Sequence, residues 1–199
     1  MSEAERLHNL ASFEILDSGP EEAFDRLTRL AAEIFDAPIS RITFVDADER
    51  EWIKSRVGFP TASVIRDGGF CARAIGLPAG SVLVVDRPEE DERHRDNPLV
   101  AQEPGVRFYA GAVLTSPDGH NLGTLSIMDD RRRPPLGAAE IGRLRTLAQV
   151  CVDALELRRV SRRASEGQRA LELVERLAVA GRLAGTAWPA PVGRVRRVS

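Results

Sequence analysis

Cys71 has the sequence surroundings best suited to chemistry. It lies in the stretch RDGGFCARAI, after two glycines and between Arg66 and Arg73. Nearby arginines and a helix N-terminus favour a reactive thiolate, whereas free cysteine is also among the residues most often buried as a small apolar side chain. We favour the buried interpretation, because the second cysteine, Cys151, is eighty residues away in the sequence and offers no nearby partner thiol.

A second candidate site lies in the segment VRFYAGAVL. Successive side chains of a strand point to opposite faces, so Arg107 and Tyr109 are expected on one face and Phe108 on the other. An arginine on such a face can hold an anionic ligand through two parallel hydrogen bonds. The alternative is a structural role, with Arg107 in a salt bridge to Asp86 or Asp96. The sequence leaves both interpretations open.

Two aromatic residues, Trp52 and Phe70, are further candidates for the walls of a ligand cleft, although the core is the simpler interpretation for both. The pair Asp129–Asp130 and the acidic run EEDERHRD lack the spacing of metal ligands. His94, within that run, is typical of a solvated surface residue. We therefore expect no metal site.

The composition argues against several classes of protein. The chain has 199 residues, a formal net charge of −2 and a pI near 6.0, so it lacks the basic field expected of a nucleic-acid-binding protein. No apolar run has the length of a membrane span, and the first residues do not resemble a signal peptide. Two distant cysteines fit a reducing compartment. We expect a cytoplasmic protein with no nucleic-acid partner and no membrane span.

The first half of the chain contains helical and then strand patterns. A short helix is expected over residues 3–16 and a longer one over about 20–35, where apolar residues recur at helical spacing. Ser18 and Glu21, three residues apart, predict a capping box for the second helix. The segment ISRITFVDADEREWIKSRVG is typical of a β-hairpin, and RDGGFCARAI is expected to begin a short helix.

The second half begins with strands and ends with a long helix. GSVLVVDRP predicts a buried strand, and VRFYAGAVL with LGTLSIMDD predicts a hairpin around the turn TSPDGHN. With the first hairpin, these segments give about six mostly antiparallel strands with helices before and after them, which is an α+β fold. From about Gly137 the pattern is helical for more than forty residues.

The later part of this helix is too polar to be buried, yet it keeps an apolar stripe. The stripe has near-heptad spacing and consists of Leu157, Val160, Ala164, Leu171, Val174 and Ala178. Such a seam favours pairing with the same helix of a second copy, so we expect a homodimer. Residues 185–199 combine Pro, Gly and Arg without periodicity and are expected to be disordered.

Several segments, in order and with fitting spacing, resemble a GAF domain: ILDSGPEEAFDRLTRLAAEIFDAPIS, ADEREWIKSRVGF, FCARAI, DNPLV and VRFYAGAVLTSPDGHNLGTLSIMD. The resemblance is to the GAF domains at the front of bacterial sensor histidine kinases and cyclic-dinucleotide enzymes. It implies a central antiparallel sheet with a helical layer that carries both termini on one face and a ligand cleft on the other. The residues expected to line that cleft are Trp52, Arg66, Phe70, Cys71, Arg73, Arg107 and Tyr109.

The resemblance divides the chain into a lead-in over residues 1–19, a GAF domain over 20–158, a signalling helix over 159–184 and a tail over 185–199. Within the signalling helix, VERLAVAGRLAG is similar to the opening of a histidine kinase dimerisation helix. In that family an Ala-His-Glu or Ala-His-Asp triplet follows, whereas TAWPAP follows here. Without that histidine and an ATP-binding domain, the chain is expected not to autophosphorylate. We interpret it as the input part of a truncated two-component sensor kinase.

Comparison with the GAF family pattern excludes some classes of ligand but does not identify one. Bilin-binding relatives place His after the anchoring Cys, where this chain has Ala72 and Arg73, so no covalent bilin is expected. The signature of cyclic-nucleotide-binding GAF domains is not found, and haem and cyclic nucleotides stay open. We expect a non-enzymatic regulatory module that binds a small ligand and signals through its C-terminal helix. The alternatives are a thiol-dependent reductase built on the same cleft and a ligand-free dimerisation module.

Overall fold

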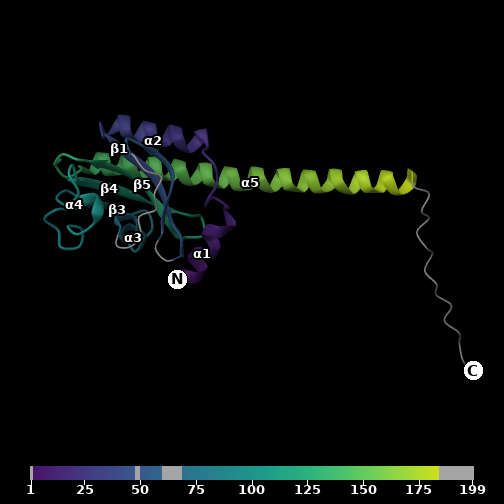
Figure 1. The fold of residues 1–199 in the computed structure, drawn as a ribbon, viewed down its shortest axis with the longest axis horizontal. Coiled ribbons are helices and arrows are strands. Elements are labelled where there is room, and N and C mark those ends of the chain that lie inside the picture. The colour runs from purple at the N-terminus through teal and green to yellow at the C-terminus, as the bar shows by residue number, and fades with distance from the viewer. Residues whose placement is uncertain (1, 48–49, 60–68, 184–199) are drawn as a thin grey trace, which may run out of the picture. The chain divides into compact units, whose positions relative to one another are not determined.

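The computed structural model describes residues 2–47, 50–59 and 69–183, and Figure 1 shows the order of the elements. They are α1 (Glu3–Ser12), α2 (Glu22–Ile34), β1 (Ile39–Val45), β2 (Glu51–Val57), α3 (Phe70–Ile75), β3 (Val82–Val85), α4 (Pro98–Ala101), β4 (Phe108–Thr115), β5 (Asn121–Asp129) and α5 (Ala138–Leu183). These elements confirm the α+β class. Both predicted hairpins and the short helix that begins at Phe70 are present.

The described strands form one antiparallel sheet of five strands in the order β2-β1-β5-β4-β3, where the sequence predicted about six. Alternation along the strands separates two faces. Ile42 and Phe44 of β1 belong to a large apolar core with residues of α1, α2 and α5, such as Leu10, Phe24 and Leu144. We call this side the helical face, and the opposite side, which α3 contacts, the α3 face.

The pairing of β1 with β2 shifts by one residue at Lys54. Ile42 pairs with Ser55 and Thr43 with Ile53, so Lys54 is the extra residue of a bulge. Its fully buried side chain donates hydrogen bonds to Ser18 Oγ at 2.8 Å, the Gly19 carbonyl at 2.6 Å and Glu21 Oε1 at 2.7 Å. The bulge therefore delivers the chain's single lysine to the connection between α1 and α2.

Glu21 Oε1 also accepts a hydrogen bond from Nε of Arg158, a residue of α5, at 2.8 Å. Burial acts to raise the pKa of Glu21, but the hydrogen bonds from Lys54 and Arg158 outweigh it and the pKa is lowered. The predicted capping box at Ser18 and Glu21 is wrong, because Glu21 makes no side-chain cap to α2 and Ser18 donates to the Ile15 carbonyl instead. A capping box is present at the start of α1, between Ser2 and Glu5.

Glu21→Ala is expected to lower the free energy of unfolding by about 2 kcal/mol, because it leaves the buried ammonium of Lys54 without its carboxylate. Glu22→Ala is the matched control. Glu22 is exposed and its ion pairs with Arg26 and Arg29 lie in solvent, so the expected loss is below about 0.5 kcal/mol. Urea unfolding of the two variants checks the difference, and equal losses would contradict this account of Glu21.

The chain divides into two compact units, Met1–Arg159 and Val160–Ser199. The first unit holds the sheet and the first part of α5, and the described part of the second is the rest of that helix. The predicted disordered tail over 185–199 lies outside the described residues. No described helix combines the length and the apolar character that crossing a membrane requires.

Candidate functional site

The α3 face combines an apolar cluster with a set of buried polar residues. The apolar cluster consists of Phe70, Val85, Leu99, Val100, Val106, Tyr109 and Met128. Beside it, alternation places Arg41 and Thr43 of β1 and Thr124 and Ser126 of β5 on the same face, and the register pairs Arg41 with Ser126 and Thr43 with Thr124. All four are fully buried, so polar side chains occupy the middle of an otherwise apolar surface.

Arg41 is the most unusual member of this set. It is 0% exposed, and its Nε, Nη1 and Nη2 atoms have no hydrogen-bond partner among the described residues. The guanidinium carbon lies 4.7 Å from the centre of the Phe59 ring, a cation–π contact. The hydroxyls of Thr43 and Ser126 are likewise unpartnered. A buried charge normally has acceptors for its hydrogen bonds, so this group is a candidate for binding.

Glu51 connects β2 to the beginning of α3. Its Oε1 accepts hydrogen bonds from the backbone N–H of Cys71 at 3.0 Å and of Ala72 at 3.3 Å. A Cβ atom at Gly69 would overlap the Glu51 carboxylate, so a larger residue there would force Glu51 to move. Burial raises the pKa of Glu51, and the nearby charge of Arg41 acts in the opposite direction. The carboxylate thus fixes α3 against the edge of the polar set.

Cys71 lies within this set as a protonated thiol. Its Sγ is 3.0 Å from Thr124 Oγ1 and 3.9 Å from the Tyr109 hydroxyl. Burial, and then the charge of Glu51, raise the pKa of Cys71 to about 12. Cys151 is buried in the core of the helical face, on the other side of the sheet. Neither geometry nor charge activates Cys71 as a nucleophile.

The aromatic rings above β4 form a stack. Phe70 lies between Tyr109, with ring centres 4.3 Å apart, and His94, with ring centres 4.6 Å apart. Gly111 makes the stack possible, because a Cβ there would overlap the Tyr109 ring and hydroxyl. His94 is buried, which lowers its pKa, and this placement corrects the expectation that it is a solvated surface residue.

Both cysteines are expected to react slowly with iodoacetamide in the folded protein at pH 8, because a thiol with a pKa of about 12 is almost entirely protonated there. The Cys151→Ser variant isolates Cys71, and the same variant in guanidinium chloride gives the unhindered rate. Mass spectrometry of timed samples should show Cys71 at least 100-fold slower when folded. Rapid labelling of folded Cys71 would contradict the buried geometry and favour a thiol-dependent enzyme.

The structure brings together only part of the predicted cleft. Phe70, Cys71 and Tyr109 meet on the α3 face, as described above. Trp52 pairs with Phe44 and packs against the core of the helical face. It therefore takes the core position that was its simpler interpretation and does not line the cleft. Arg73 is exposed on α3, and Arg66 lies outside the described residues.

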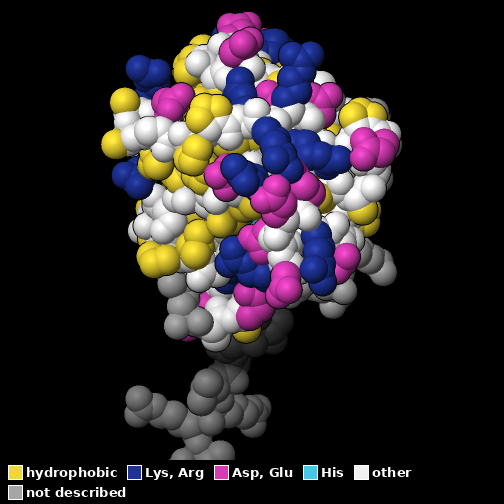
Figure 2. All heavy atoms as spheres, turned by 90° about the vertical axis from the view of Figure 1, so that its left-hand side faces the viewer, with side chains coloured by type: hydrophobic (Ala, Val, Ile, Leu, Met, Phe, Trp, Pro, Cys, Tyr) yellow, Lys and Arg dark blue, Asp and Glu magenta, His cyan; other side chains and the backbone are white. Residues whose placement is uncertain are grey.

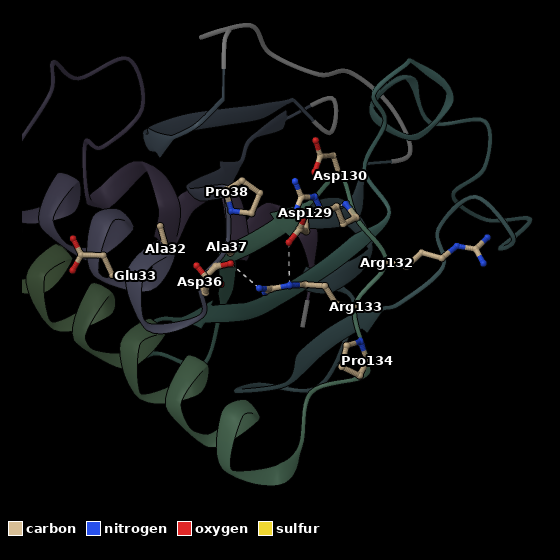
Figure 3. Close-up of a pocket in the computed structure, with 11 residues that line it drawn as sticks. Ala32, Glu33, Asp36, Ala37, Pro38, Asp129, Asp130, Arg132, Arg133 and Pro134 are labelled. Atoms are coloured by element: carbon tan, nitrogen blue, oxygen red, sulfur yellow. Dashed lines mark hydrogen bonds and ion pairs between the residues drawn. The ribbon is translucent and has the colours of Figure 1, made fainter.

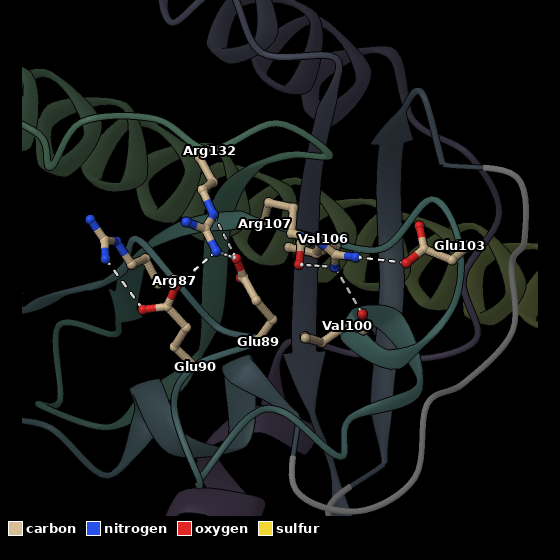
Figure 4. Close-up of polar contacts among 8 residues, drawn as sticks. All are labelled: Arg87, Glu89, Glu90, Val100, Glu103, Val106, Arg107 and Arg132. Carbon is tan, nitrogen blue, oxygen red and sulfur yellow. Dashed lines mark hydrogen bonds and ion pairs between the residues drawn. The ribbon is translucent and has the colours of Figure 1, made fainter.

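Arg107 is held by the loop around α4 (Figure 4). Its guanidinium donates to the carbonyls of Val100 at 2.9 Å and Val106 at 3.2 Å and pairs with Glu103 at 3.2 Å. Arg107 therefore has the structural role that the sequence left open, but its ion pair is with Glu103 and not with Asp86 or Asp96. Both N–H groups of Nη1 are used in these contacts, so Arg107 holds the loop around α4 in place.

A surface groove of about 820 Å³ lies between the end of α2 and the segment that follows β5 (Figure 3). Arg133 crosses it, with Nε 3.0 Å from Asp129 Oδ2 and Nη2 2.6 Å from the Asp36 carbonyl. The guanidinium lies over the Phe108 ring at 5.9 Å. Arg133 thus ties the segment before α5 to the end of α2.

Charges of both signs are interspersed on the face shown in Figure 2. Figure 4 shows pairs of opposite charge, Arg132 with Glu89 and Glu90, and Arg87 with Glu90. Among the described residues, no three His, Cys, Asp or Glu side chains are arranged to hold a metal ion.

Sequence reasoning missed Arg41, Thr43, Glu51 and Ser126. A signal for Arg41 was present in the run ISRITFV, where one arginine interrupts β-branched and aromatic residues in a strand that is buried on both faces. In a run of that kind, alternation alone predicts an inward-facing charge. Glu51 had no comparable signal, because its partners lie on α3, twenty residues later in the chain.

The fold defines the class of protein: an antiparallel sheet with a helical core on one face and a short helix over buried polar residues on the other. A domain of a two-component sensor histidine kinase from Sinorhizobium meliloti shares it with a TM-score of 0.56 over 75% of this chain and 97% of that domain, at 14% identity. The blue-light-absorbing form of the PixJ GAF domain from Thermosynechococcus elongatus gives 0.56 over 86% and 98%, also at 14% identity.

The sequence match is to the same class. The GAF domain profile matches residues 19–155, and the chain therefore belongs to the GAF domain family, whose role is sensory. A cyclic di-GMP phosphodiesterase from Pseudomonas aeruginosa is 37% identical over 136 residues, which are 68% of this chain and 23% of that relative. The chain thus spans less than a quarter of the relative's length, and what the two share is this domain.

Proposed function

We propose that this chain is a sensory input module that binds a small ligand on the α3 face and signals through α5, which pairs with the same helix of a second copy. The observation that carries the proposal is the buried guanidinium of Arg41 beside two buried hydroxyls, all three without a hydrogen-bond partner among the residues that the structure describes. Polar groups that converge in an apolar setting are the usual mark of a small-molecule site.

The helix α5 supplies the second half of the proposal. Along its later part it keeps a row of large apolar side chains that are more than half exposed: Leu157, Val160, Leu171 and Val174. Their positions follow the heptad repeat of a two-stranded coiled coil. A monomer leaves this row in water, whereas a parallel dimer buries it.

A physical connection between the two parts runs through β2. Glu51, at one end of the strand, holds the start of α3, and Lys54, three residues later, holds Glu21 and through it Arg158 of α5. A ligand that shifts Glu51 or α3 acts on the same short strand that anchors α5. Coupling of this kind requires two arrangements of α5 with different ligand affinity.

The output of the module is the finer part of the proposal. Residues 174–185 resemble the opening of a histidine kinase dimerisation helix, which favours the input part of a two-component sensor kinase. The cyclic di-GMP phosphodiesterase that is 37% identical to this domain supports a regulatory domain that is joined to different catalytic partners. In either case the chain regulates and does not itself catalyse.

The proposal is tested by thermal unfolding of the full chain with a panel of nucleotides, haem, bilins, amino acids and small organic acids. We expect at least one compound to raise the unfolding midpoint in proportion to the logarithm of its concentration, as ligand linkage requires. Absence of any shift across the panel would contradict ligand sensing and favour the ligand-free dimerisation module.

A further inference from the structure

Two buried cations lie on neighbouring strands and face opposite sides of the sheet. Lys54 of β2 has no exposed side-chain surface and has three acceptors on the helical face. Arg41 of β1 is equally buried on the α3 face and has no hydrogen-bond acceptor among the described residues. The described residues therefore accept all the hydrogen bonds that the ammonium of Lys54 can donate, and none from the guanidinium of Arg41.

Arginine stays charged in proteins, and burying its guanidinium without hydrogen-bond acceptors costs free energy. The Phe59 ring and the nearby charge of Glu51 interact with Arg41, but no described residue accepts a hydrogen bond from its guanidinium. Its neighbours point to binding. The hydroxyls of Thr43 and Ser126 lie on the same face, both are fully buried, and neither has a hydrogen-bond partner within the described part of the chain.

The surroundings select the chemistry of the partner. A planar guanidinium matches a carboxylate through two parallel hydrogen bonds, and the two hydroxyls can donate to the same oxygens. The Phe59 ring covers the guanidinium, and Ile39 and Phe59 pack against the apolar cluster of this face, so the remainder of the ligand meets apolar surface. The carboxyl group of Glu51 is close enough to interact electrostatically with Arg41 and disfavours a ligand with several negative charges.

We propose, resting on the function proposed above, that the α3 face binds a small monocarboxylic acid with an apolar body, whose carboxylate is held by Arg41, Thr43 and Ser126. Inorganic phosphate offers similar oxygens but carries a second negative charge near neutral pH, so it binds more weakly. The neutral amide of the same acid lacks the charge that Arg41 recognises.

The test uses the full chain and acetate, propionate, butyrate and benzoate as probes, with the amides of the same acids and inorganic phosphate beside them. Thermal unfolding and titration calorimetry are measured for the wild type, Arg41→Met and Lys54→Met. We expect at least one carboxylate to raise the wild-type unfolding midpoint and its amide and phosphate to have little effect. Arg41→Met should weaken carboxylate binding at least 100-fold.

Lys54→Met is the matched control, because it also removes a buried cation from the sheet. It discards three hydrogen bonds, so its midpoint should fall while carboxylate binding persists. Thr43→Val keeps the shape of the side chain and is expected to weaken binding about 10-fold with little change in stability. This variant keeps the test decisive if Arg41→Met does not fold.

The inference would be overturned by equal shifts with the amides and the acids, or by no shift with any of the carboxylates. A neutral compound that binds the wild type and Arg41→Met equally would also overturn it, but would leave the proposed sensory function standing. The proposed sensory function is tested separately, by thermal unfolding with the wider panel of compounds and by measurement of the oligomeric state.

Discussion

Replacing Phe70 with alanine is expected to lower the free energy of unfolding by about 3–5 kcal/mol, the usual cost of removing a fully buried phenylalanine. Phe70 is 1% exposed and is the middle ring between Tyr109 and His94. It is also the first residue of α3, so its loss opens a cavity where α3 packs on the sheet. Chemical unfolding at 25 °C measures the change directly.

Phe70→Leu is the conservative control for this prediction. Leucine keeps most of the apolar volume, and the expected loss is below about 1.5 kcal/mol. A loss under 1 kcal/mol for the alanine variant would contradict the stacked arrangement. It would mean that α3 contributes little to the stability of the domain, and that the side chains on the α3 face are not tightly packed.

Replacing Leu171 with glutamate is expected to weaken the dimer at least 100-fold, which corresponds to about 3 kcal/mol. Leu171 lies at a seam position of the heptad repeat, between Ala164 and Ala178, so each copy would place a carboxylate opposite the other. The side chain is 54% exposed in the single chain, and the substitution should therefore leave the stability of the sheet-bearing unit unchanged. Sedimentation equilibrium checks the dissociation constant.

Leu173→Glu is the matched control for the seam. Leu173 is 58% exposed and lies two residues away on the same helix, but it is not at a seam position. Its replacement should change the dissociation constant of the dimer less than fivefold. Equal effects of the two substitutions would indicate that general charge, and not a heptad seam, governs association.

Much of the fold could be predicted because its signals are local. The helical spacing of Phe24, Leu27 and Ala31 predicted α2, and the turn around Pro117 and Gly119 predicted the β4–β5 hairpin. Helix caps were less secure, because a polar side chain near a helix end has several possible partners. Glu21 has the spacing of a cap, yet it serves Lys54 and Arg158, which are distant in sequence.

The site was only partly predictable because its residues come from five separate elements. Cys71 and Tyr109 were identified from their residue types, and both lie on the α3 face. Arg41 was passed over although the run ISRITFV around it is typical of a strand that is covered on both sides. Trp52 was named from its residue type, and it packs on the helical face instead.

The central claim is that a ligand on the α3 face changes the association of α5 with a second copy. The most direct measurement is the dimer dissociation constant, obtained by sedimentation equilibrium between about 0.5 and 50 μM protein, with and without the compound that gives the largest thermal shift. We expect a dimer whose dissociation constant changes at least fivefold when that compound is saturating. A chain that stays monomeric over this range, or a dimer that the ligand leaves unchanged, would contradict the account.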